Sequence, residues 1–145
     1  MTGVFPAAAL ISAIMFASWA LYVTLVEHPA RLDSGAGPGR AQFRPSYRRA
    51  APWQASFAVI ACAAGVAMAI ATSRWLWLAG ALAIGAAVPF TLVVIKPVNG
   101  TLLSSTPLSD EDTRRLLQRW GRLHAVRTLL GGAGVLAFLG ALGSR

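Results

Sequence analysis

Charged residues are scarce in this chain, and their scarcity excludes a soluble globular protein. Asp, Glu, Lys and Arg make up 12% of the 145 residues, against about 25% in soluble domains. Hydrophobic residues make up 56% and the mean hydropathy is +0.59. Segments without a charged side chain cover residues 1–26, 50–73, 75–95 and 128–144. Since a membrane-spanning helix needs about 20 apolar residues, we expect an all-α integral membrane four-helix bundle.

Cysteine, histidine and the common catalytic motifs are also scarce. The single cysteine, Cys62, lies in the second apolar segment and excludes both a disulfide framework and a CxxC motif within one chain. No Gly-rich phosphate loop, GxSxG elbow or HExxH motif is present. Nucleotide use, acyl transfer and zinc proteolysis therefore lack their usual sequence signals.

The apolar segments predict helices at about 4–26, 53–72, 75–95 and 110–142, all in a single membrane domain covering residues 1–145. The first segment is too long for a signal peptide and lacks a basic n-region and a small-residue cleavage site, so we expect it to be retained. The last helix has a strong start signal, because the N-cap residue Ser109 precedes three acidic residues, Asp110 to Asp112.

Positive charge is distributed unevenly between the connections. Eleven of the 13 Lys and Arg residues lie between Arg31 and Arg49 or between Lys96 and Arg127, whereas Arg74 and Arg145 stand apart. Cytoplasmic flanks accumulate Lys and Arg, so we expect a multi-pass protein of the bacterial inner membrane with both termini extracytoplasmic. The charge of +8 is then a topology signal, and nucleic acid is not expected as a partner. The sequence does not decide between a monomer and a homo-oligomer.

Polar side chains from four segments converge on the cytoplasmic edge of the predicted bundle. Ionisable groups at membrane depth are costly and therefore indicate function. Trp120, His124 and Arg127 have the spacing i, i+4, i+7, which places them on one helix face. The other candidates are Glu27, His28, Tyr47, Arg48, Gln54 and Asn99.

Each of these residues also has a purely structural interpretation. Arg127 is able to snorkel to lipid phosphates, His124 to bridge helices and His28 to cap a helix end, while Asn99 between Pro97 and Gly100 is typical of a turn. Two chemistries remain open. Histidine is able to act as a general base beside arginine and asparagine, or His28, His124 and Glu27 form a two-His, one-carboxylate set for iron or copper.

In several short motifs the chain resembles the small four-helix membrane family, largely of unknown function, that includes the anthrone oxygenases. Phe43, where an indole is common, and Lys96, where an apolar residue is usual, depart from the pattern. The matching motifs are Glu27-His28-Pro29-Ala30-Arg31, Arg44-Pro45-Ser46-Tyr47-Arg48-Arg49, Pro89-Phe90-Thr91-Leu92, Pro97-x-Asn99-x-x-Leu102 and Trp120-x-x-x-His124-x-x-Arg127.

The resemblance implies an oxygenase that converts an anthrone to an anthraquinone with O2 and no organic cofactor. Its partners are then the lipid bilayer, a hydrophobic aromatic molecule and O2. The family analogy makes His124 the base, with His28 as the alternative, and sets Arg127 and Asn99 on the phenolate or enolate oxygen. Trp120 is expected to stack on the substrate, with Tyr47 and Arg48 at the entrance. The alternative function is a small, non-catalytic membrane subunit that assembles with a partner complex; a transporter ranks lower.

The charge asymmetry generates a first testable prediction. Single cysteines at positions 36 and 74 are expected to react with a membrane-impermeant thiol reagent from opposite sides, because positions 31–49 carry the cytoplasmic arginines. Labelling is measured on intact cells and on inverted vesicles. Reaction of position 36 from outside intact cells would refute the expected orientation.

Overall fold

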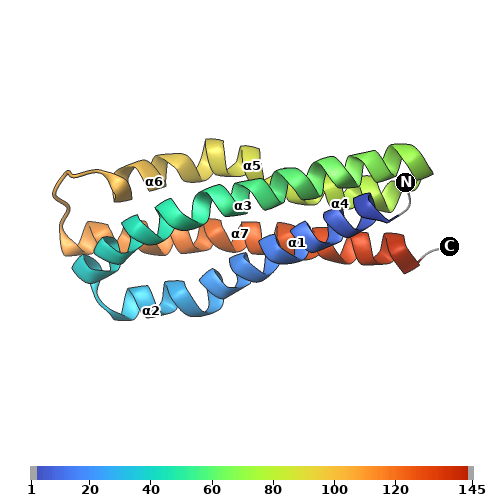
Figure 1. The fold of residues 1–145 in the computed structure, drawn as a ribbon. Coiled ribbons are helices and arrows are strands. Elements are labelled where there is room, and N and C mark those ends of the chain that lie inside the picture. The colour runs from blue at the N-terminus through green and yellow to red at the C-terminus, as the bar shows by residue number, and fades with distance from the viewer. Residues whose placement is uncertain (1–2, 144–145) are drawn as a thin grey trace.

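The protein is described by a computed structural model covering residues 3–143, which form four long helical segments (Figure 1). All four segments are long and apolar enough to cross a membrane, so the all-α four-helix prediction is confirmed. In chain order the elements are α1 (Val4–Tyr22), the π-helical turn η1 (Val23–Glu27), α2 (His28–Asp33), α3 (Ala36–Thr72), α4 (Trp75–Gly85), α5 (Ala87–Phe90), the π-helical turn η2 (Thr91–Ile95), α6 (Lys96–Leu103) and α7 (Asp110–Gly143).

Three helical segments extend further than the sequence predicts. The first continues through η1 and α2 to Asp33 instead of ending near Val26. The second begins at Ala36 rather than Trp53 and continues through Pro45 and Pro52. The third continues to Leu103 instead of ending near Ile95, because Pro97 occupies a first-turn position of α6, where a missing N–H is tolerated. The stretch expected as the first connection is therefore mostly helical.

Two arginines of α3 bind the carboxyl end of α6. Arg40 donates hydrogen bonds from Nε to the carbonyl oxygen of Leu102 at 3.2 Å and from Nη2 to that of Ser104 at 2.8 Å. Its Nη2 also reaches the Thr101 carbonyl, and its Nη1 the Thr106 carbonyl. Arg44 reaches the carbonyl oxygen of Leu103 at 2.5 Å. The last carbonyls of a helix have no intrahelical donor, so these contacts stabilise both the end of α6 and the helical start of α3.

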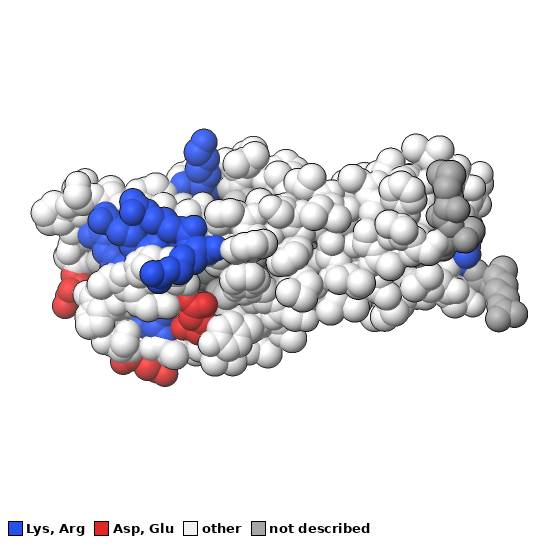
Figure 2. Space-filling view, viewed as in Figure 1, with Lys and Arg blue, Asp and Glu red and all other residues white. Residues whose placement is uncertain are grey.

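The helices pack as a square in which α1 and α4 each contact both α3 and α7. Both ends of the described chain lie at the same end of the bundle (Figure 1). Charged side chains gather mainly at the opposite end, around α2, the start of α3, the end of α6 and the start of α7 (Figure 2). The middle and the terminal end of the surface are mostly uncharged, as expected for a lipid-facing surface.

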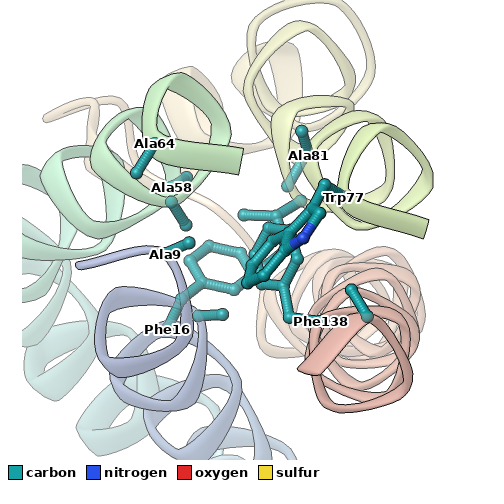
Figure 3. Packing of buried hydrophobic residues seen from close by; sticks show 12 residues of the cluster. Ala9, Phe16, Ala58, Ala64, Trp77, Ala81 and Phe138 are labelled. Carbon is teal, nitrogen blue, oxygen red and sulfur yellow. The ribbon is translucent and has the colours of Figure 1, made fainter. Parts of the chain in front are cut away.

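The half of the bundle near the termini has a tightly packed apolar core. Small residues let three large rings, Phe16, Trp77 and Phe138, fill the centre between the helices (Figure 3). At the crossing of α4 and α7, a Cβ atom added at Gly134 would collide with the side chain of Ile84 and lie 3.2 Å from the carbonyl oxygen of Gly80. Glycine at this position is therefore required for close approach of the two backbones.

The two π-helical turns occupy corresponding places in the first and third segments. The N–H of His28 bonds to the Val23 carbonyl and that of Lys96 to the Thr91 carbonyl, five residues back in each case. One extra residue per turn rotates everything that follows by about 100° around the helix axis. Pro29 and Pro97 come next in the sequence, and the residue two positions after each proline is buried. The turns thus direct Arg31 and Asn99 into the bundle.

The packing of α4 against α7 generates a second prediction. Gly134→Leu is expected to lower the free energy of unfolding by about 2 kcal/mol or more, because the helices must separate to admit the side chain. Gly132→Leu is the matched control, since a Cβ at Gly132 meets no atom within 4 Å. Unfolding is followed by circular dichroism in mixed micelles. Equal stability of the two variants would contradict the close crossing.

Candidate functional site

Buried polar residues gather around Trp120, in the half of the bundle nearer its charged end. The Trp120 ring stacks on the His124 ring with centroids 4.7 Å apart and an interplanar angle of 13°. Its Nε1–H donates to Asn99 Oδ1 at 2.8 Å, and Phe43 meets it edge-on at 5.2 Å. Because partners on several helices hold the indole, the His124 ring that stacks on it is held in place as well.

His124 is buried and has no ordinary hydrogen bond. It is 2% exposed, and neither ring nitrogen has a hydrogen-bond partner among the described residues. The carbonyl oxygen of Ala20 approaches the ring, but it accepts its regular hydrogen bonds from the Val23 N–H and from Thr128 Oγ1 at 3.2 Å. Buried polar atoms are nearly always satisfied by protein or water. The imidazole is therefore available to bind something else.

Arg127 lies one turn further along α7 and points into the bundle. Its Nη2 donates to Gln54 Oε1 at 2.6 Å, and its guanidinium lies 5.4 Å from the centroid of the Phe16 ring. Its Nε is buried without a hydrogen-bond partner within residues 3–143. These contacts place the charge between α1, α3 and α7, so Arg127 does not snorkel to the lipid surface.

A second buried charge, Arg31, contacts the other side of the same cluster. Its guanidinium lies over the rings of Phe43 at 5.3 Å and Trp120 at 5.4 Å. Arg31 Nη2 donates to Glu27 Oε1 at 2.6 Å. That carboxylate oxygen also accepts hydrogen bonds from Gln42 and Ser46 of α3. The arrangement neutralises Arg31 and joins the first helical segment to the second.

Two adjoining cavities open beside this cluster. The inner cavity, of about 30 Å³, lies among Arg31, Phe43, Trp120 and His124. The outer cavity, of about 160 Å³, is lined by Phe16 and by residues of α3, α5 and η2. The two share four lining residues, Tyr47, Ala51, Gln54 and Arg127. The Arg127–Gln54 hydrogen bond therefore lies at the boundary between the two spaces.

The structure brings together some of the predicted site residues and separates others. Trp120, His124, Arg127 and Tyr47 all line the inner cavity. Asn99 lines neither cavity; it is a helical residue bonded to Trp120, and the expected turn is wrong.

Two further predicted residues lie away from both cavities. Arg48 is exposed on α3. His28 lies in a separate groove with Leu32, Gln118 and Gly121, its ring against the Gly121 backbone.

Arg31 is the residue that the sequence prediction placed too far from the site, whereas Gln54, a sequence candidate, lies in it. Arg31 was expected among the cytoplasmic loop arginines, yet it is 4% exposed. Its separation of four residues from Glu27 is a signal for an ion pair on a helix. Its place at the start of a run of arginines does not distinguish it from the exposed ones. Gln54 is 3% exposed within an otherwise apolar stretch of α3. A lone amide in an apolar helix is the signal that points to its interior position.

The alternative metal set does not assemble. Within residues 3–143 no group of three or more His, Cys, Asp or Glu side chains is close enough to hold a metal ion. Glu27 is engaged by Arg31 and α3, whereas His28 and His124 both contact the Trp120 ring, one tilted at 5.3 Å and the other stacked. In this arrangement the described side chains of His28, His124 and Glu27 do not form one ligand group.

The buried ion pair generates a third prediction. Glu27→Ala is expected to lower the free energy of unfolding by about 2 kcal/mol or more, because it leaves the Arg31 charge buried and unpaired. Glu111→Ala is the matched control: its i,i+4 pair with Arg115 is 69–74% exposed, against 2–17% for Arg31 and Glu27. Exposed pairs contribute about 0–1 kcal/mol. Equal losses in denaturant titrations would contradict the proposed difference.

Comparison with known proteins gives one match to a family. No curated protein and no solved structure matches the chain. Residues 43–137 match the family described as anthrone oxygenase. The matched region covers more than half of the chain and contains most of the residues that line both cavities, including Gln54, His124 and Arg127. The chain therefore belongs to the anthrone oxygenase family.

Proposed function

We propose that the protein is a membrane-embedded oxygenase that converts an anthrone-type polycyclic phenol to the corresponding anthraquinone with O2. The observation that carries the proposal is the buried His124 imidazole, which has no hydrogen-bond partner among the described residues and lines a cavity beside Arg127. Membership of the anthrone oxygenase family supports the same reaction class.

The reaction needs a base and a stabilised anion. Removal of a proton from the benzylic CH2 between two aromatic rings gives a carbanion that is delocalised onto the ketone oxygen. This electron-rich anion transfers one electron to O2, and the resulting radical pair combines to a hydroperoxide. Loss of water from the hydroperoxide leaves the second carbonyl group. Anthrone and O2 thus give anthraquinone and one H2O, and no further oxidant or reductant is consumed.

His124 is the proposed base. A neutral imidazole carries its proton on one ring nitrogen and leaves the second nitrogen with its lone pair free. The stack on Trp120 orients the ring at the inner cavity. A base held in this way needs no reorganisation to receive a carbon-bound proton.

Arg127 is the proposed partner of the developing enolate or phenolate oxygen. Its buried Nε and its Gln54-bonded Nη2 face a site with little solvent, where a fixed positive charge acts strongly. Asn99 and Trp120 are assigned a positioning role instead of direct substrate contact. Asn99 orients Trp120 through the 2.8 Å hydrogen bond, and the Trp120 ring in turn orients His124, which stacks on it.

The proposed orientation follows the charge distribution. The end bearing most Lys and Arg (Figure 2) is cytoplasmic, and both termini are extracytoplasmic, in the bacterial inner membrane. The proposed site then lies within the bundle on the cytoplasmic half. A hydrophobic phenol dissolved in the bilayer reaches this depth without crossing water.

The proposed base generates a fourth prediction. His124→Ala is expected to lower the rate of anthrone oxidation by about 100-fold or more, because general-base catalysis typically contributes that much. His28→Ala is expected to cost much less, since His28 lies in a separate groove. Both rates are measured as O2 uptake and quinone formation in nanodiscs, with circular dichroism as the control for folding.

Two outcomes would contradict this assignment. Full activity in both histidine variants would show that neither histidine is the general base, and it would favour a non-catalytic membrane subunit. Activity that is lost on chelation, and restored by iron or copper in metal-analysed protein, would transfer the histidines to metal ligation.

A further inference from the structure

Three alanines of α3 line one wall of the outer cavity. Ala51, Ala55 and Ala58 line it from α3 at the spacing i, i+4, i+7, so their methyl groups share one helix face. The α3 helix packs closely along α4 and has few contacts with α5. The cavity therefore exists because the small residues of α3 face α5 and η2, which pack less closely against α3 than α4 does.

The opposite wall is the irregular part of the third segment. There Ala87, Val88, Thr91 and Leu92 line the cavity, from α5 and the π-helical turn η2. Pro89 has no N–H to bond to the preceding turn. Two residues later, the Thr91 N–H and Thr91 Oγ1 both donate to the Ala87 carbonyl, the hydroxyl at 2.7 Å. Because the backbone here is not a regular α-helix, it diverges from the straight course of α4 (Figure 1).

The mouth of this cavity lies between exposed apolar side chains of segments able to cross a membrane. Ala55 is exposed and Leu92 is 59% exposed, and both lie in segments able to cross a membrane. The polar lining side chains besides Thr91 are Tyr47, Gln54 and Arg127, the residues shared with the inner cavity. The outer cavity therefore leads from an apolar mouth to a polar end beside the inner cavity.

We infer that the outer cavity is a lateral entrance through which a planar aromatic ketone or phenol passes from the bilayer, between α3 and the α5–η2 segment, to Arg127. This inference rests on the proposed function and names the route and the residues that select substrates by size. The ligand's oxygen replaces Gln54 Oε1 as acceptor for Arg127, while its rings occupy the alanine-lined space. Ala55 and Leu92 set the width of the mouth.

This route differs from the entrance expected from the sequence. That expectation placed Arg48 beside Tyr47 at the mouth, but Arg48 is exposed and lines neither cavity. Passage through the charged end would also require a hydrophobic polycycle to leave lipid for a region rich in guanidinium groups (Figure 2). The lateral route keeps the rings in an apolar environment until the oxygen meets Arg127.

The test is the fifth prediction and uses bulky substitutions at the mouth with matched neighbours. Ala55→Phe and Leu92→Trp narrow the entrance, whereas Ser56→Phe and Val93→Trp add the same rings at exposed positions that line neither cavity. Binding of 1,8-dihydroxyanthraquinone to the full chain in lipid nanodiscs is measured by its fluorescence. We expect about tenfold weaker binding in the two mouth variants and binding within about twofold of wild type in the two controls.

Catalysis and stability are measured on the same four variants. The mouth variants are expected to lower kcat/KM for anthrone oxidation about tenfold while thermal unfolding stays at the wild-type temperature, because both positions face lipid. Leu92→Ala widens the mouth without adding bulk and is expected to retain or strengthen binding. These measurements separate a blocked route from a misfolded protein.

The outcomes distinguish the entrance from the proposed reaction. Equal binding in mouth and control variants, with oxidation intact, would overturn the lateral entrance alone. Binding that is sensitive to Ala55 and Leu92 but accompanied by no oxidation of anthrones would support the entrance and refute the proposed reaction. Absence of binding to wild-type protein would overturn the entrance, since the cavity would then not admit aromatic phenols.

Discussion

The hydrogen bond from Trp120 Nε1 to Asn99 Oδ1 is the interaction on which the candidate site depends. It joins α7 to α6 and sets the plane of the indole. His124 stacks on that plane, and Arg31 lies over it. In an apolar interior a neutral N–H and an amide oxygen have no water to compete for them, so leaving either unpaired is costly. One neutral bond thereby orders a histidine and a buried arginine without adding a charge.

Asn99 is available for this role because of an irregularity in the helix before it. The turn η2 rotates the residues after Ile95, just as η1 rotates those after Glu27, and in each segment the residue two positions beyond the proline enters the interior. Without the extra residue of each π-helical turn, Arg31 and Asn99 would lie about 100° away from their present positions around the helix axis. The polar cluster is therefore a product of backbone register as much as of side-chain chemistry, and irregular helical turns of this kind recur at functional sites.

The features that follow from hydropathy and from regular helical spacing were predictable from the sequence. The number of spans and the shared face of Trp120, His124 and Arg127 depend only on apolar length and the 3.6-residue period. The burial of Arg31 was not, because a π-helical turn changes the register without a distinct residue pattern. The helical start of α3 was also missed, since the carbonyl oxygens that bind Arg40 and Arg44 come from residues about 60 positions away.

Arg40 links the orientation of the protein in the membrane to its fold. It belongs to the set of positive charges from which the cytoplasmic side is predicted, and the same guanidinium holds the carboxyl end of α6 through several carbonyl oxygens. A lysine would preserve the charge but lacks the fork that reaches several acceptors at once. A substitution that removes this charge would therefore also release the connection between α6 and α7 from α3.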